Sequence, residues 1–193
     1  MRKPRLKAPP EQPFGFYHCY SRVVNRDFVL LEPERDKFVE LMRRYEAFCG
    51  VHVETYSVMS NHFHILLEVP ARPKIPLTDD ELLERCAIIY DAKELKKIRR
   101  QLELRRERVK DWNQFREKYL CRMWDVSQFM KELKQRFAQW YNYEGPHRRK
   151  GVFWAQRFGS TLIEGTIDAV QAMAAYIDLN PVRVGLVEDP KDY

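Results

Sequence analysis

The stretch 61–69, NHFHILLEV, alternates in a way that predicts a β-strand with one buried face. Its apolar side chains fall on odd positions, and side chains two residues apart on a strand share a face. These positions are Phe63, Ile65, Leu67 and Val69. His62 and His64 then project together from the opposite face, about 6.6–7 Å apart along the strand.

Two imidazoles at that separation can converge on one divalent ion. Neutral imidazole is a good metal ligand at pH 7, and its second nitrogen can be oriented by a nearby acceptor. The alternative is a pair of exposed or hydrogen-bonded histidines on an ordinary half-buried strand, since short motifs often occur by chance. From this motif alone, a metal site at His62 and His64 is one of two hypotheses.

The sequence around this strand predicts three more strands and several helices. Strands are indicated by aromatic and β-branched runs, and helices by apolar residues at helical spacing with caps at their ends. Pro33 opens the first helix and Gly50 ends it, while Pro181 disfavours helical geometry just before it. The predicted order is a strand at 14–24, a helix at 33–49, strands at 51–58 and 62–69, a helical stretch from 78, a helix at 125–145, a strand at 151–164 bulged at Gly159, and a helix at 166–180.

This order, β-α-β-β-insertion-α-β-α, predicts an α+β fold. Without the insertion and the last helix it is the ferredoxin-like split βαβ plan, with an antiparallel sheet. The expected insertion covers about 78–118 and starts with a capping box at Thr78 and Glu81. We expect a flexible basic arm at 1–13 and a single domain over 14–190. Because this plan serves many functions, the function must be argued from the site.

The composition excludes several classes of protein. The 193 residues are 45% hydrophobic and 32% charged, which is typical of a folded globular protein. No apolar run reaches the roughly 18–20 residues of a membrane helix, and the basic N-terminus lacks the apolar stretch of a secretory signal. The four cysteines show no metal-binding spacing, so reduced thiols in a cytoplasm are expected.

Basic residues gather in two places. The chain has 34 Lys and Arg against 28 Asp and Glu, a net charge of +6. Residues 93–110 hold nine Lys or Arg against three Glu, and HRRK at 147–150 adds a second cluster. Such patches suit a nucleic-acid phosphate backbone. The alternative for each run is a solvated helix face.

Tyr176 and Asn180 are four residues apart in the predicted last helix, so they share a helix face. A tyrosine hydroxyl beside a metal-bound phosphate can attack phosphorus and form a covalent phosphotyrosine. The amide oxygen of Asn180 could complete the coordination of the metal. The alternative is a packing tyrosine and a helix-terminal asparagine, and spacing alone does not decide between the two.

Five blocks of sequence, in order, carry a family resemblance. They are YHCYSR, SNHFHILLEV, KQRFAQWYN, KGVFWAQRF and YIDLNPVR. HFH resembles the His-hydrophobic-His motif of the HUH endonucleases. Its combination with AAYIDLNPVRVGLV resembles the single-tyrosine transposases of bacterial insertion sequences, and most of all the REP-associated tyrosine transposases. The resemblance covers roughly residues 14–190.

The resemblance implies a metal-dependent enzyme that nicks and rejoins single-stranded or hairpin DNA. Tyr176 would be the nucleophile and would stay joined to a DNA 5′-phosphate, leaving a free 3′-hydroxyl. His62, His64 and Asn180 would bind Mg²⁺ or Mn²⁺. We expect DNA as the partner, no membrane, a monomer or homodimer, and a cytoplasmic, nucleoid-associated location.

DNA contacts outside the chemistry are expected near the fourth strand. Arg148, Arg149, Lys150 and Arg157 are candidates for phosphate contacts. Trp154 is a candidate for base stacking, with the buried face of the strand as its alternative. The N-terminal Arg2, Lys3, Arg5 and Lys7 enter a groove of a hairpin stem or form a free tail.

Two rival functions stay open. One is a DNA-binding protein of the same ancestry that does not cut. The other is an RNA-binding ferredoxin-like module that stacks bases on Phe16, Tyr17 or Tyr20. Of the other tyrosines, Tyr141 is expected in the core and Tyr143 on the surface.

Overall fold

The computed structural model describes residues 5–145 and 150–190, and a four-stranded antiparallel sheet forms its centre. The strands are β1 (Phe14–Arg22), β2 (His52–Val58), β3 (His62–Pro70) and β4 (Gly159–Ile163). Their order across the sheet is β2-β3-β1-β4, and every neighbouring pair is antiparallel. The predicted α+β fold with a split βαβ sheet is confirmed.

The alternation predicted for β3 separates a buried face from a second face of the sheet. Phe63, Ile65 and Leu67 are fully buried in the main core, whereas His62 and His64 are half-buried on the other side. The register places Ser57 of β2 and Tyr20 of β1 on either side of His64. The face that carries the two histidines is called the site face below.

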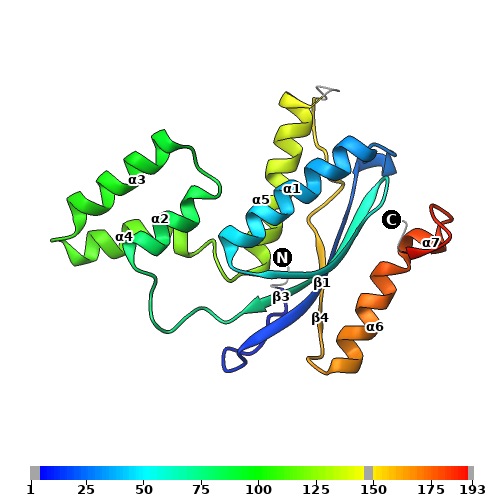
Figure 1. Cartoon of the computed structure of the whole chain (residues 1–193), viewed down its shortest axis with the longest axis horizontal. Coiled ribbons are helices and arrows are strands. Elements are labelled where there is room, and N and C mark those ends of the chain that lie inside the picture. The colour runs from blue at the N-terminus through cyan, green and yellow to red at the C-terminus, as the bar shows by residue number, and fades with distance from the viewer. Residues whose placement is uncertain (1–4, 146–149, 191–193) are drawn as a thin grey trace.

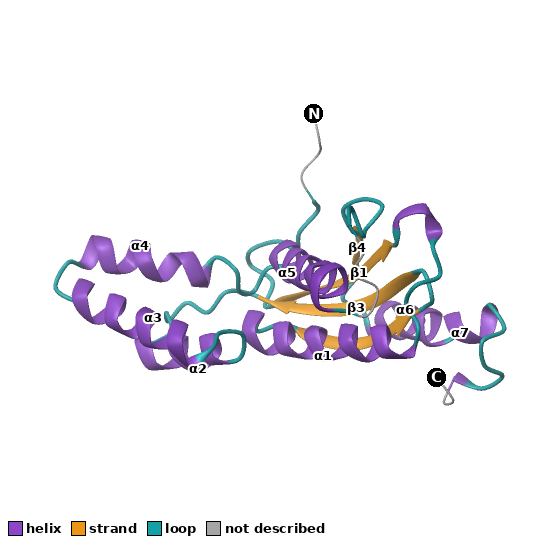
Figure 2. Cartoon of the chain, turned by 90° about the horizontal axis from the view of Figure 1, so that it is seen from above, coloured by secondary structure: helices purple, strands orange, loops and turns teal. Residues whose placement is uncertain are grey.

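Helices cover the two faces unequally, as Figures 1 and 2 show. α1 (Glu32–Cys49) and α5 (Val126–Gln139) pack on the core face and against each other. α6 (Ile167–Asp178) packs across β2 and β3 on the site face and leads into the short α7 (Asn180–Arg183). Within the described part of the chain, the helical cover of the site face therefore lies mainly over β2 and β3, and β1 and β4 are less covered.

The predicted strand at 151–164 is wrong over most of its length. Only Gly159–Ile163 forms a strand, and before it Trp154 makes a single bridge to Val23. Phe153, Trp154 and Phe158 are buried in this irregular segment, so their apolar character reflects core packing rather than strand pairing. The predicted bulge at Gly159 is also wrong, because this residue pairs in register with Tyr20.

The predicted helical insertion forms an arm of three helices that projects from one end of the molecule (Figure 1). They are α2 (Asp79–Ala87), α3 (Ala92–Arg105) and α4 (Val109–Leu120). The last of them ends two residues past the expected end of the insertion at about residue 118. The predicted capping box is present, with Thr78 and Glu81 bonded to each other's backbone. α6 lies at the opposite end of the molecule from the arm.

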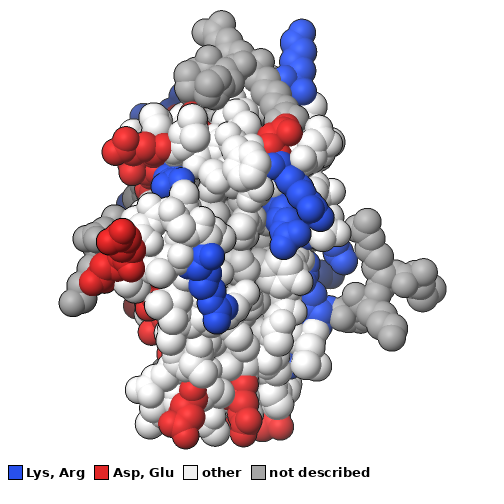
Figure 3. Space-filling model, turned by 90° about the vertical axis from the view of Figure 1, so that its right-hand side faces the viewer, with Lys and Arg blue, Asp and Glu red and all other residues white. Residues whose placement is uncertain are grey.

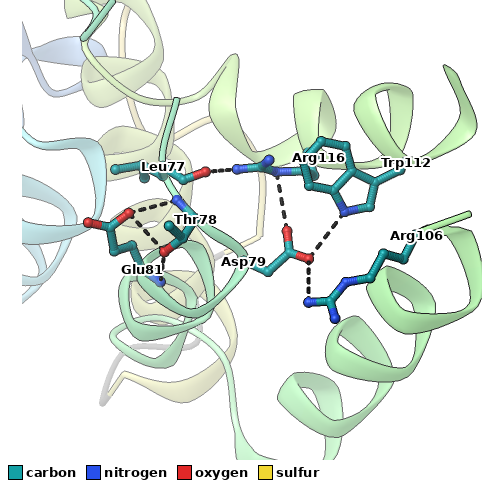
Figure 4. Close-up of polar contacts among 7 residues, drawn as sticks. All are labelled: Leu77, Thr78, Asp79, Glu81, Arg106, Trp112 and Arg116. Atoms are coloured by element: carbon teal, nitrogen blue, oxygen red, sulfur yellow. Dashed lines mark hydrogen bonds and ion pairs between the residues drawn. The ribbon is translucent and has the colours of Figure 1, made fainter. Parts of the chain in front are cut away.

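Asp79 joins the three helices of the arm (Figure 4). Its carboxylate lies 3.5 Å from the Nε atom of Arg116 on α4 and 3.9 Å from a guanidinium nitrogen of Arg106 at the end of α3. The indole nitrogen of Trp112 donates to the same carboxylate at 3.2 Å. Since Arg116 is buried and its guanidinium also donates to the carbonyl of Leu77, this cluster fixes the helices to one another.

The described part of the N-terminal segment lies against the sheet. The guanidinium of Arg5 donates to Ser160 and to the carbonyl of Phe158, and it lies 3.4 Å from the centre of the Phe158 ring. Lys7 pairs with Asp125. Both cations therefore contact protein groups. Among the helices that the structure describes, none combines the length and the apolar character that crossing a bilayer requires.

Candidate active site

His62 and His64 project side by side from β3, with ring centroids 5.2 Å apart and planes at 83°. In each ring the Nδ1 atom has a hydrogen-bond partner. His62 Nδ1 lies 2.6 Å from Asn61 Oδ1, and His64 Nδ1 lies 2.8 Å from His18 Nε2. These contacts leave the Nε2 atom of each ring for a ligand, which is the arrangement expected of a histidine pair that binds a metal.

The environment keeps these imidazoles neutral. Burial, with His18, His62 and Arg22 nearby, lowers the pKa of His64 to about 3. Burial and Arg22 also lower the pKa of His62, and burial lowers that of His18. Because a metal ligand must offer a free electron pair, the neutral form is the one that binds a cation.

The contacts between α6 and the sheet position Tyr176. Asp178, two residues further on, accepts a hydrogen bond from the Thr55 hydroxyl of β2. Ile177 of α6 and Leu66 on the site face of β3 are both fully buried, although neither belongs to the main core. Thus buried apolar side chains and the hydrogen bond between Thr55 and Asp178 hold α6 on the site face.

The ring of Tyr176 reaches the histidine cluster of its own chain. Its centroid lies 6.0 Å from that of His64 and 5.9 Å from that of His18, and both contacts are edge-on. The side chain is 40% exposed, so a ligand on the site face can approach it. Residues more than a hundred positions apart in the sequence therefore meet within one subunit.

Asn180 follows Tyr176 by four residues, where α6 passes into α7. It is half-buried, and its Nδ2 atom is buried without a hydrogen-bond partner in the part of the chain that the structure describes. The nitrogen and oxygen of a carboxamide are assigned from the hydrogen-bond network, so this side chain can equally present its oxygen there. An unsatisfied buried amide is costly unless a ligand completes it.

The chemistry of His62, His64 and Asn180 would suit a divalent ion that keeps open coordination positions. Over residues 5–145 and 150–190, no group of three or more His, Cys, Asp or Glu is arranged to hold a metal. Two imidazoles and one amide would supply three ligands, and substrate oxygens and water would supply the rest. These residues suit a catalytic site better than a closed structural one.

Two arginines border the cluster. The guanidinium of Arg183, on α7, lies 5.4 Å from the centre of the Tyr176 ring. Arg22, at the end of β1, pairs with His62 in the sheet and lies near enough to both imidazoles to lower their pKa. A phosphate bound between Tyr176 and the histidines would therefore have two guanidinium groups nearby.

The other expected DNA contacts have different surroundings. Lys150 and Arg157 are exposed, whereas Arg148 and Arg149 lie outside the described residues. Trp154 is only 8% exposed, and its indole nitrogen donates to the carbonyl of Lys134. Trp154 is therefore a core residue, which was the alternative to its predicted role in base stacking.

Three residues of the cluster were missed or given another role from sequence. His18 had no role, Tyr20 appeared only as an RNA-stacking candidate, and Arg183 appeared only within a motif. His18 and Tyr20 alternate with core residues along β1, and β1 is the neighbour of β3 in the ferredoxin-like plan. This signal was sufficient to place them beside His64.

Residues 115–180 match the family model described as "Transposase IS200 like". Within this segment, the match agrees with the predicted resemblance to the transposases of bacterial insertion sequences. The matched segment contains Tyr176 and Asn180 and begins after the His62-Phe63-His64 motif. No curated protein sequence matches the chain.

A comparison with solved structures gives matches that include these two. The first is a REP-associated tyrosine transposase bound to a REP hairpin, with a TM-score of 0.57 and 17% identity over 100% of this chain and 80% of the other. The second, a protein of Deinococcus radiodurans R1 described as a transposase, has 13% identity over 92% of this chain and 96% of the other. Its TM-score of 0.41 is too low for a conclusion about the fold. The first similarity shows a shared fold.

Proposed function

We propose that this protein is a transposase-like enzyme that nicks and rejoins single-stranded or hairpin DNA, with Tyr176 as the nucleophile. The observation that carries the proposal is the position of the Tyr176 ring, whose centroid lies 6.0 Å from that of His64 on the site face. The family match over residues 115–180 supports a DNA transposase function. The similarity to a transposase bound to a REP hairpin supports hairpin DNA as the substrate class.

The chemical step is a transesterification. The Oη atom of Tyr176 attacks the scissile phosphorus, a bond forms between them, and the bond from phosphorus to the 3′ oxygen breaks. The phenol proton leaves to solvent, and the departing 3′ oxygen takes up a proton. The product is a 5′-phosphotyrosine with a free 3′-hydroxyl on the other strand end.

Rejoining reverses this chemistry. A 3′-hydroxyl attacks the phosphotyrosine, the new phosphodiester forms, and the phenol of Tyr176 is released. Because the phosphotyrosine is itself a phosphodiester, no external energy source is needed for strand transfer.

The remaining residues would bind and orient the phosphate. His62, His64 and Asn180 would hold Mg²⁺ or Mn²⁺, which when bound polarises a phosphoryl oxygen. Arg183 and Arg22 would contact the non-bridging oxygens with charge-assisted hydrogen bonds. Lys150 and Arg157 would contact phosphates outside the site. On this proposal the protein works at the nucleoid.

The decisive experiment is a denaturing gel of protein with labelled hairpin DNA carrying unpaired flanks, in Mn²⁺ and in EDTA. We expect a covalent protein–DNA band in Mn²⁺ that is lost in Tyr176→Phe. Tyr143→Phe is the matched control, because Tyr143 is 76% exposed and follows α5, which packs on the core face of the sheet. A band of wild-type yield from Tyr176→Phe would refute the nucleophile, and hairpin binding without any band would favour a non-cleaving DNA-binding protein.

A further inference from the structure

The uncovered half of the site face carries a row of aromatic side chains along β1. Phe14 and Tyr20 are 41% and 39% exposed, and Phe16 between them is partly exposed. The rings of Phe14 and Phe16 are 5.4 Å apart. Exposed rings on a sheet face are costly to hydrate and offer flat surfaces to a ligand.

Of the three aromatic residues in this row, Tyr20 is the one that contacts His18 and His64. Its ring centroid is 6.0 Å from that of His64, with planes at 30°, and 5.6 Å from that of His18. The aromatic row therefore leads directly to the imidazoles. A group stacked on Tyr20 would lie next to a phosphate held at His64.

Gly159 explains how the Tyr20 ring is held. The two residues face each other in the register of β1 and β4. A Cβ atom at residue 159 would overlap the Tyr20 ring, so the ring occupies the space beside the backbone of β4 that a side chain would fill. The glycine thus serves to seat the ring on the sheet with one side turned to solvent.

Charge favours the Tyr20 end of the row for a polyanion. Arg22 follows Tyr20 on β1, and Arg183 lies over the Tyr176 ring. At the other end, Glu68 of β3 faces Phe16 in register. Figure 3, viewed from the side where α6 lies, shows Lys and Arg side chains in the middle and on one flank of the visible surface and acidic side chains at its foot.

From these observations we propose that Tyr20, seated on Gly159, is the stacking site for an unpaired nucleobase next to the scissile phosphate. The occupant is single-stranded DNA, and Phe16 extends the platform by a weaker site because Glu68 faces it. Stacking on an aromatic ring suits an unpaired base, whose faces are free. This inference rests on the proposed function and adds to it the residue that holds the unpaired strand.

The test measures binding in EDTA, where no cleavage is proposed to occur. The probes are a DNA hairpin with an unpaired extension of mixed sequence, the same hairpin without the extension, and an RNA strand of the same sequence as the extension. We expect Tyr20→Leu to weaken binding of the extended hairpin about ten-fold and to leave the blunt hairpin unchanged. Tyr20→Phe keeps the ring and should bind as wild type.

A spectroscopic readout identifies the contact itself. With 2-aminopurine scanned through the extension, one position should be quenched by the wild type and by Tyr20→Phe but not by Tyr20→Leu. Leu104→Ala, which removes a 63% exposed apolar side chain on the arm, is the matched control. Gly159→Ala provides an independent variant, because it displaces the ring without removing it, and circular dichroism checks that it folds.

The outcomes separate this inference from the proposed function. Unchanged binding and quenching in Tyr20→Leu would overturn the stacking site even where the Tyr176 adduct forms normally. Tighter binding of the RNA strand than of the extended DNA hairpin would also overturn it. A protein that binds neither hairpin would instead refute the proposed function.

Discussion

The Nε2 atom of His18 lies 2.8 Å from the Nδ1 atom of His64, and the two rings are nearly parallel with centroids 5.0 Å apart. For His64 to bind a metal through Nε2, its Nδ1 atom must carry a proton and donate it to His18. His18 would therefore act through His64, as a positioning residue that fixes one tautomer and one ring orientation.

His18→Leu is expected to weaken Mn²⁺ binding about 10- to 100-fold, the usual effect of losing such a partner. His18→Gln should lose less, because its amide oxygen can accept the same hydrogen bond. The measurement is a titration of Mn²⁺ followed by electron paramagnetic resonance in the absence of DNA. His52→Gln is the matched control, an exposed histidine on β2. Wild-type affinity in His18→Leu would show that His64 needs no partner.

Much of the fold was predictable because local patterns and the global topology agree. Alternation in residues 61–69 fixed which side of β3 faces the core, and caps at Gly50, Thr78 and Asp125 marked helix ends. The segment 151–158 was not predictable in this way. Its aromatic residues are buried without strand pairing, and a short apolar run looks the same in both situations.

The candidate site was predictable only in part. His62, His64 and Tyr176 came from the motif and the resemblance, and the structure brings them together. His18 and Tyr20 required the pairing of β1 with β3 to be considered, because no sequence motif joins them. Arg183 required the three-dimensional path of the chain beyond Pro181, where α7 turns its guanidinium over the Tyr176 ring.

Arg183→Ala is expected to slow formation of the Tyr176 adduct roughly 100-fold, as is typical when a charged donor to a reacting phosphate or oxyanion is removed. Arg183→Lys should recover part of this rate, because the positive charge remains while the forked geometry is lost. Single-turnover kinetics on labelled hairpin DNA measures both. Arg43→Ala, an exposed arginine of α1 on the core face, should react as wild type. An equal loss in Arg183→Lys and Arg183→Ala would point to geometry rather than charge.

The Asp79–Arg116 contact makes a prediction about the arm. Asp79→Leu leaves the Arg116 guanidinium buried without its carboxylate, which should cost about 3–5 kcal/mol of unfolding free energy. Adding Arg116→Met should restore much of that loss, since an apolar pair of similar size needs no counter-ion. Urea unfolding of both variants measures the difference. Asp80→Leu, whose side chain is 84% exposed, should change stability by about 0.5 kcal/mol or less.

A double variant as unstable as Asp79→Leu alone would contradict this account of the arm. In that case the carboxylate of Asp79 would stabilise the arm mainly through Trp112, whose indole nitrogen donates to it at 3.2 Å. Trp112→Phe removes that donor and keeps an aromatic ring beside Arg116, so it separates the two contributions.

Lys134 is buried, and among the described residues it has no carboxylate partner; it donates to Ser21 Oγ at 2.7 Å and to the carbonyl of Gln156 at 2.8 Å. Burial, with Arg5 nearby, lowers its pKa to about 8. In the unfolded chain the pKa of a lysine is about 10.4, so between these two values the unfolded state binds more protons. The contribution of Lys134 to stability must therefore rise with pH across this window.

Lys134→Met removes the titration, and its stability relative to wild type is expected to fall as pH rises from 7 to 10. The shift should be roughly 3 kcal/mol, at about 1.4 kcal/mol for each unit by which folding lowers the pKa. Urea unfolding of both proteins across this pH range measures the difference in unfolding free energy. The contributions of the other titratable groups cancel in this difference, because both proteins contain them. Lys131→Met, an exposed lysine one turn earlier on α5, should show no such trend. A difference between Lys134→Met and wild type that stays constant with pH would mean that Lys134 keeps its ordinary proton affinity in the fold.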